Sequence, residues 1–107
     1  MDMVDQFDIY LVDLDPTVGS EIKKIRPCVV ISPNQMNKHL NTVLVAPMTS
    51  ALKNYPFRVR SSFQGKEGDI ILDQIRTVSK LRFIKKMGTL DKAKSYLVLS
   101  LLQEMFS

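Results

Sequence analysis

Cysteine is nearly absent from this chain of 107 residues, in which Cys28 stands alone. One cysteine can form neither an intrachain disulfide nor a zinc site built of several thiolates, so the sequence requires no oxidising compartment. A run of about 18 apolar residues is absent too, and residues 1–15 are acidic where a signal peptide would be basic. We therefore expect a cytoplasmic protein that is neither secreted nor inserted in a membrane.

Glycine and proline are also few, with 4 and 5 residues, which excludes a collagen-like or low-complexity chain. The hydrophobic share of 45% is ordinary for a globular protein, and the sequence contains no internal repeat and no linker. A chain of this length suffices for one hydrophobic core but not for two. The sequence thus predicts a single domain over residues 1–107.

Lysine and arginine are absent from the first 22 residues, which carry six acidic side chains. All 15 basic residues follow this segment, against five acidic ones, and the formal net charge of the chain is +4. This imbalance fits either an ordinary solvated basic surface or a face that binds phosphates or an acidic protein partner.

Motifs for metals and nucleotides are absent as well. The sequence has no glycine-rich phosphate loop, no HExxH motif and no pair of cysteines. His39 is the one histidine and cannot build a metal site by itself; it is either a surface residue or a general base. Cys28 lies in an apolar run, which is typical of a small core residue. We therefore expect no metal and no cofactor.

Short apolar segments separated by turn residues predict a mainly β fold. Residues 7–14 predict a half-buried strand with Phe7, Ile9 and Leu11 on one face, and residues 28–31 a strand buried on both faces. Between them, residues 15–25 predict a loop. Further strands are expected over residues 42–47, with Pro47 as the end or at an edge, and over 57–60, 69–76 and 82–84.

Two segments predict helices. Ser32, Pro33 and Asn34 can cap a short turn through Asn37, and residues 91–105 combine a capping Asp91 with apolar residues at helical spacing. The second helix carries more apolar side chains than one core-facing stripe requires, which indicates a second apolar surface that a partner would cover. The fold class expected is a small, curled antiparallel β-barrel with short helices and a C-terminal helix.

Polar side chains gather where these segments end, and they are the candidates for a functional site. They are Glu21, Arg26, Thr49, Ser50, Asp73, Gln74 and Arg76. Each is ordinary by itself, since an arginine can pair with any carboxylate and a Thr-Ser pair can form a turn. Composition and spacing predict no more than a small basic barrel that binds an anion.

Five successive motifs resemble those of the MazF family, toxins of bacterial toxin–antitoxin systems in the PemK, Kid and CcdB-like superfamily. They lie at residues 12–21, 26–33, 45–50, 55–57 and 72–77, in the same order and at similar spacing. The resemblance implies an SH3-like, CcdB-like barrel, a homodimer, and metal-independent cleavage of single-stranded mRNA at specific sites that contain ACA. It also implies inhibition of growth, and neutralisation by a MazE-type antitoxin whose flexible acidic tail covers the RNA site.

The resemblance further implies roles for single residues. Arg26 and Thr49 match the catalytic pair of the family, and Glu21 lies in the loop that would close on RNA. The other residues expected to bind RNA are Asp15, Thr17, Gly19, Ser20, Ser50, Tyr55, Asp73, Gln74 and Arg76.

The chemistry agrees in part with these roles. Attack of a ribose 2′-hydroxyl on its own phosphate needs a base, an acid and positive charge at the phosphate. Arg26 supplies charge and a planar set of donors, and Thr49 can donate one hydrogen bond. A guanidinium with a pKa above about 12 is a poor base. The identity of the general base is therefore undecided, and Glu21 is a further candidate for it. Kid-type toxins place an arginine two residues before the Asp73 position, where this chain has Ile71.

Two alternatives remain at this point. One is a non-catalytic toxin that poisons gyrase as CcdB does, which relies on a C-terminal tail with an aromatic residue; this chain ends instead in a helical pattern. The other is an inactive family member that acts only as a binding partner, and the presence of Arg26 and Thr49 argues against it.

Overall fold

A computed structural model describes residues 3–15, 19 and 24–107. The strands over these residues form one curled antiparallel sheet. They are β1 (Asp8–Asp13), β2 (Ile25–Val30), β3 (Thr42–Thr49), β4 (Arg58–Phe63), β5 (Lys66–Ile71), β6 (Arg76–Ser79) and β7 (Phe83–Thr89). The helices are α1 (Asn34–Asn37) and α2 (Lys92–Met105), and two short 3-10 turns are η1 (Leu72–Gln74) and η2 (Lys80–Arg82). The expected mainly β fold with a C-terminal helix is confirmed.

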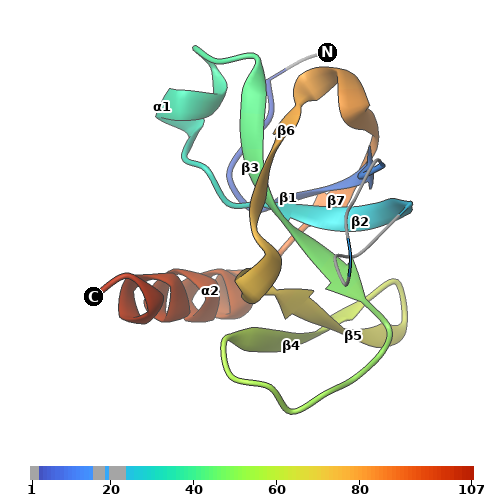
Figure 1. Ribbon diagram of the computed structural model, residues 1–107, viewed down its shortest axis with the longest axis vertical. Helices are drawn as coiled ribbons and strands as arrows, with labels where there is room; N and C mark the ends of the chain where they lie inside the picture. Colours follow the sequence, from blue (N-terminus) through green and yellow to red (C-terminus); the bar gives the residue numbers. More distant parts are fainter. Residues whose placement is uncertain (1–2, 16–18, 20–23) are drawn as a thin grey trace.

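The strands follow the order β4-β5-β3-β2-β1-β7, and β6 pairs with β3 beside this path. Strand β3 therefore has two neighbours on one side, β6 along its first half and β5 at its end (Figure 1). The prediction that this strand ends at Pro47 is wrong, because it continues to Thr49. Pro47 pairs with Cys28 of β2 on one side only. On the other side it lies between the last β6 pair, at Val45, and the first β5 pair, at Met48, so the strand has a local edge there, as the alternative prediction for Pro47 expected.

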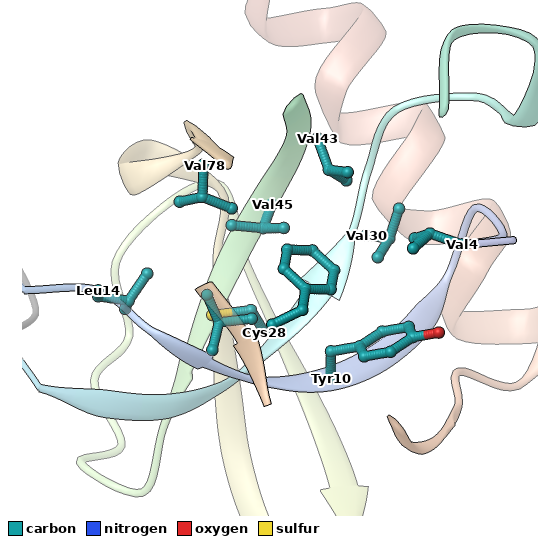
Figure 2. Packing of buried hydrophobic residues seen from close by; sticks show 10 residues of the cluster. Val4, Tyr10, Leu14, Cys28, Val30, Val43, Val45 and Val78 are labelled. Carbon is teal, nitrogen blue, oxygen red and sulfur yellow. The ribbon is translucent and has the colours of Figure 1, made fainter. Parts of the chain in front are cut away.

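Buried side chains form two clusters, one on each face of β1 and β2. Figure 2 shows the first cluster, which includes Tyr10, Cys28 and Val45. Ile9 belongs to the second cluster, so β1 is buried on both faces and its predicted half-buried pattern is wrong. Both clusters cover this strand, and even Asp8 is buried, where it accepts hydrogen bonds from the Asp5 amide and the Thr89 hydroxyl. The predicted two-sided burial of residues 28–31 is confirmed.

The predicted strand over residues 69–76 is wrong, because it is two strands separated by η1. Strand β5 begins at Lys66, since the preceding turn needs only Gln64 and Gly65, both with positive φ. The last strand extends from Phe83 to Thr89, beyond the expected residues 82–84.

The first helical turn exists, but no side chain caps it. The Ser32 hydroxyl instead donates to the side-chain oxygen of Asn37 at 2.6 Å and accepts from the Leu44 amide, so it ties the turn to β3. The predicted capping role is therefore wrong. In α2, by contrast, the predicted cap is confirmed, since Asp91 accepts from the Lys94 amide at 2.8 Å.

Helix α2 lies beside β4 and packs Val98, Leu101 and Met105 against the second cluster. Its other faces leave large apolar side chains exposed, as predicted, among them Tyr96, Leu97, Leu99 and, just after its end, Phe106. Within the part of the chain that the structure describes, no helix is both long and apolar enough to cross a membrane.

Candidate functional site

Arg26 and Thr49 line one hollow of about 260 Å³. Arg26 comes from the start of β2 and Thr49 from the end of β3. These strands are antiparallel with Cys28 opposite Pro47, so the start of one lies beside the end of the other. Ser50 continues from β3 into the same hollow. The sequence thus predicted three residues that the sheet brings together.

The opposite wall of this hollow comes from the hairpin of β4 and β5, which the sequence analysis did not single out. It contributes Phe63, Gln64, Lys66, Glu67 and Gly68. Gly68 precedes the strand expected over residues 69–76 but lies inside the actual strand β5, so its position in the sequence did not mark a close approach of two backbones. The hollow combines the cations of Arg26 and Lys66 and nearby hydroxyl groups with the single carboxylate of Glu67, and the excess of donors suits an anion such as a phosphate.

Thr49 also borders a second hollow, of about 520 Å³. Three further predicted residues line it, Tyr55, Asp73 and Gln74, together with Arg58. Because Thr49 belongs to both hollows, the two hollows are neighbours at the end of β3.

An ion pair occupies the second hollow. Arg58 donates from Nε and Nη2 to the two carboxylate oxygens of Asp73, at 3.0 and 3.1 Å. Its guanidinium carbon also lies 4.7 Å from the centre of the Tyr55 ring. The hydrogen bond with Asp73 raises the pKa of Arg58 above its ordinary value. The sequence motifs predict Asp73 and Tyr55 but not Arg58, because the alternation of apolar and basic side chains in residues 57–60 does not reveal which basic residue is enclosed.

The segment between β3 and β4 carries Ser50 and Tyr55 and is fixed at its middle by Asp69. This buried carboxylate accepts from the Lys53 amide at 3.0 Å and from Nε of Arg60 at 2.8 Å. Burial acts to raise the pKa of Asp69, but the hydrogen bonds from Arg60 and Lys53 and the charges nearby lower it further than burial raises it. Asp69 therefore remains ionised and holds this segment against β5.

Among the described residues, Asp15, Gly19 and Arg76 were also predicted to bind RNA but line neither hollow. Arg76 donates to the Leu14 carbonyl at 3.2 Å, and Asp15 accepts from the Lys24 amide at 2.9 Å, while its own carbonyl accepts from Arg82. Gly19 is exposed, with φ of +64°. Thr17, Ser20 and Glu21 fall outside the described residues, so their roles stay predictions.

Cys28 is fully buried, and burial raises the pKa of its thiol to about 12, although Arg76 and Arg26 partly oppose this. The interpretation of Cys28 as a core residue is confirmed, since a thiol with this pKa stays protonated near neutral pH. His39 is exposed and lines neither hollow. Among the described residues, no three His, Cys, Asp or Glu side chains gather as a metal site would need.

Comparison with known proteins gives a consistent result. Residues 5–106 match the family described as "PemK-like, MazF-like toxin of type II toxin-antitoxin system". The chain is 40% identical over 86 residues to the endoribonuclease toxin MazF of Escherichia coli K12, covering 79% of this chain and 78% of that protein.

Solved structures of low sequence identity share the fold. MazF from Deinococcus radiodurans superimposes with a TM-score of 0.87 at 23% identity, over 99% of this chain and 98% of that one. A MazE-MazF structure from the same organism gives a TM-score of 0.81 at 20% identity, over 100% and 98% of the two chains. The family match covers nearly the whole sequence, and the chain therefore belongs to the PemK-like, MazF-like toxins of type II toxin–antitoxin systems.

Proposed function

We propose that this protein is an endoribonuclease toxin that cleaves single-stranded mRNA at the hollow lined by Arg26 and Thr49. One observation carries the proposal: two strands bring these residues into one hollow, beside a second hollow large enough for a neighbouring nucleotide. The Escherichia coli relative is named an endoribonuclease, which favours RNA cleavage over the gyrase-poisoning alternative.

The proposed reaction uses a nucleophile that belongs to the substrate. The ribose 2′-hydroxyl gives its proton to a base and attacks the adjacent phosphorus, while the bond from phosphorus to the 5′-oxygen breaks. The leaving 5′-oxygen takes up a proton, for which Arg26 is the candidate donor. The products are a 2′,3′-cyclic phosphate and a 5′-hydroxyl. Because the nucleophile is already attached to the reacting phosphate, the step needs no metal-bound water, and we propose that it is metal-independent.

Arg26 stabilises the negative charge that grows on the phosphate oxygens, since its planar guanidinium can donate to two of them at once. Thr49 donates one further hydrogen bond from its hydroxyl, which in this structure accepts from the Ala51 amide at 3.2 Å. That bond leaves the hydroxyl hydrogen available for the phosphate. Glu21 is the candidate for the base that takes the 2′-hydroxyl proton.

The chain also offers surfaces for the partners that we propose. Apolar side chains of α2 border a hollow of about 440 Å³ that includes Tyr96 and Leu99, and a second copy of the chain would cover them in a homodimer. A MazE-type antitoxin with a flexible acidic tail would neutralise the toxin by occupying the basic hollow of Arg26 and Lys66. A cut site that contains ACA is proposed from the family resemblance.

The experiment is incubation of the protein with one long RNA in the presence of EDTA, followed by mapping of every new end. We expect cuts at a few repeated short sequences that contain ACA, each leaving a cyclic phosphate and a 5′-hydroxyl. A matched oligonucleotide with a single 2′-deoxyribose at the mapped position should bind and resist cleavage. Continued cleavage of the deoxy substrate would contradict the internal attack, and activity that disappears with EDTA would contradict metal independence.

A further inference from the structure

The ion pair in the second hollow is unequally exposed. The Arg58 side chain is 11% exposed, whereas the Asp73 side chain is 45% exposed. Arg58 is thus enclosed beneath Tyr55 and points its charge at Asp73, and Asp73 presents a carboxylate to the hollow. An enclosed guanidinium that already donates hydrogen bonds from two of its nitrogens is poorly placed to bind phosphate. Its role is therefore to act on Asp73.

A lone carboxylate would repel RNA, because the phosphates of the substrate carry the same charge. The two hydrogen bonds from Arg58 to Asp73 offset that charge and fix the plane of the carboxylate. Each carboxylate oxygen accepts one of these bonds and keeps a lone pair for another donor. The hollow therefore presents a fixed acceptor that a polyanion can approach.

Tyr55 provides the apolar side of the same hollow. The residue is 53% exposed, and two cations lie over its ring, with the guanidinium carbon of Arg58 at 4.7 Å and Nζ of Lys53 at 5.6 Å from the centre. An exposed aromatic ring that is fixed in this way can stack on a nucleobase, a contact that all bases make. Stacking gives affinity, and the Asp73 acceptor beside it gives the choice of base.

We propose that Arg58 is a positioning residue that holds Asp73 as the acceptor for an exocyclic amino group of a nucleobase stacked on Tyr55. The hollow then selects adenine, cytosine or guanine over uracil, whose single N–H lies between two carbonyl oxygens that the carboxylate repels. Because Thr49 borders both hollows, the selected base belongs to a nucleotide next to the cut. This inference rests on the proposed ribonuclease function and assigns one part of its specificity.

The test compares cleavage rates of short single-stranded RNAs that differ only in one base beside the mapped cut. The wild-type protein should prefer an amino-bearing base over uracil by about tenfold or more at one position, as expected for a good base contact. Arg58→Gln should reduce that preference below about threefold while preferences at other positions persist. Asp73→Asn, whose amide can donate, should shift the preference at the same position towards uracil.

Lys85→Gln is the matched control, because it removes the same charge from an exposed position on β7 that lines neither hollow. It should keep the wild-type preference. Thermal unfolding checks that each variant folds, and Asp73→Asn, at the more exposed partner, supplies the readout if Arg58→Gln does not fold.

Three outcomes contradict the inference in distinguishable ways. If the wild-type protein cuts RNA and both variants keep its base preference, Arg58 and Asp73 do not read a base, and the ribonuclease function stands. If the variants slow cleavage of every substrate equally, the pair has only a structural role. If the wild-type protein cuts no RNA, the proposed function fails and this inference fails with it.

Discussion

Gly68 lies so close to Thr49 that a Cβ at this glycine would be 2.8 Å from the Thr49 carbonyl oxygen. Strand β5 reaches the end of β3 only because this position has no side chain, and both residues line the hollow that we assign to the reacting phosphate. A methyl group at position 68 would therefore force apart two strands that both line this hollow.

Gly68→Ala should force β5 away from the end of β3. We expect a loss of about 1–3 kcal/mol in the free energy of unfolding, typical of overpacking, and a lower rate of RNA cleavage because Thr49 moves. Urea denaturation and a cleavage assay measure the two effects. Gly65→Asn is the control, since Gly65 has open space around it and asparagine tolerates its φ of +77°. Unchanged stability and activity in Gly68→Ala would contradict the role of this close approach.

Asp69→Asn should lower the stability of the protein in a pH-dependent way. The pKa of Asp69 is lowered from its ordinary 3.8, so its ionised form contributes stability that is fully present above about pH 4 and is lost as the pH falls through the lowered value. We expect the variant to be about 1–2 kcal/mol less stable near pH 7, with the difference shrinking in strong acid. Urea denaturation at several pH values measures this.

An Arg60→Gln background provides the control for Asp69, because Arg60 is one of its two hydrogen-bond partners. Asp69→Asn should lower the free energy of unfolding less in that background than in the wild-type protein. If the loss of stability caused by Asp69→Asn depends neither on pH nor on the presence of Arg60, Asp69 does not stabilise the protein through its charge.

Leu99→Glu should weaken the proposed homodimer. Leu99 is 37% exposed on α2 and borders the apolar hollow of that helix, so a charge there would be buried in the interface. Sedimentation at micromolar concentration should show a dimer for the wild-type protein and a shift towards monomer for Leu99→Glu. Asn41→Asp adds the same charge at an exposed position outside α2 and should remain dimeric. A wild-type monomer would contradict the dimer, and a dimeric Leu99→Glu would place the interface elsewhere.

Local features of the fold could be predicted from the sequence, and features that depend on distant contacts could not. The Asp91 cap of α2 and the buried run from Cys28 to Val30 depend on neighbouring residues, and the sequence predicted both. Burial of β1 on both faces depends on how the sheet curls, which alternation within eight residues cannot reveal. Strand β3 likewise continues through Pro47 because its neighbour on one side changes there from β6 to β5, which the sequence does not reveal.

The candidate site divides in the same way. The motifs predicted Arg26, Thr49 and Asp73, because each stands beside recognisable neighbours in the sequence. Lys66 belongs to the wall formed by the β4–β5 hairpin, and Arg58 is the ion-pair partner of Asp73. Both reach the site through the pairing of strands in space, so no local pattern in the sequence marked them. Side chains that complete a site across a sheet are the ones that a single sequence reveals least.

The single-turnover cleavage rates of four proteins on one mapped RNA test most directly whether RNA is cut at the hollow of Arg26 and Thr49. These are the wild-type protein, Arg26→Ala, Arg26→Lys and Thr49→Ala, each shown to be folded by its thermal unfolding. Arg26→Ala should lose nearly all activity, Arg26→Lys should recover only part because a point charge cannot donate to two oxygens, and Thr49→Ala should lose less than Arg26→Ala. Folded Arg26→Ala and Thr49→Ala proteins that cut at the wild-type rate would contradict cleavage at this hollow.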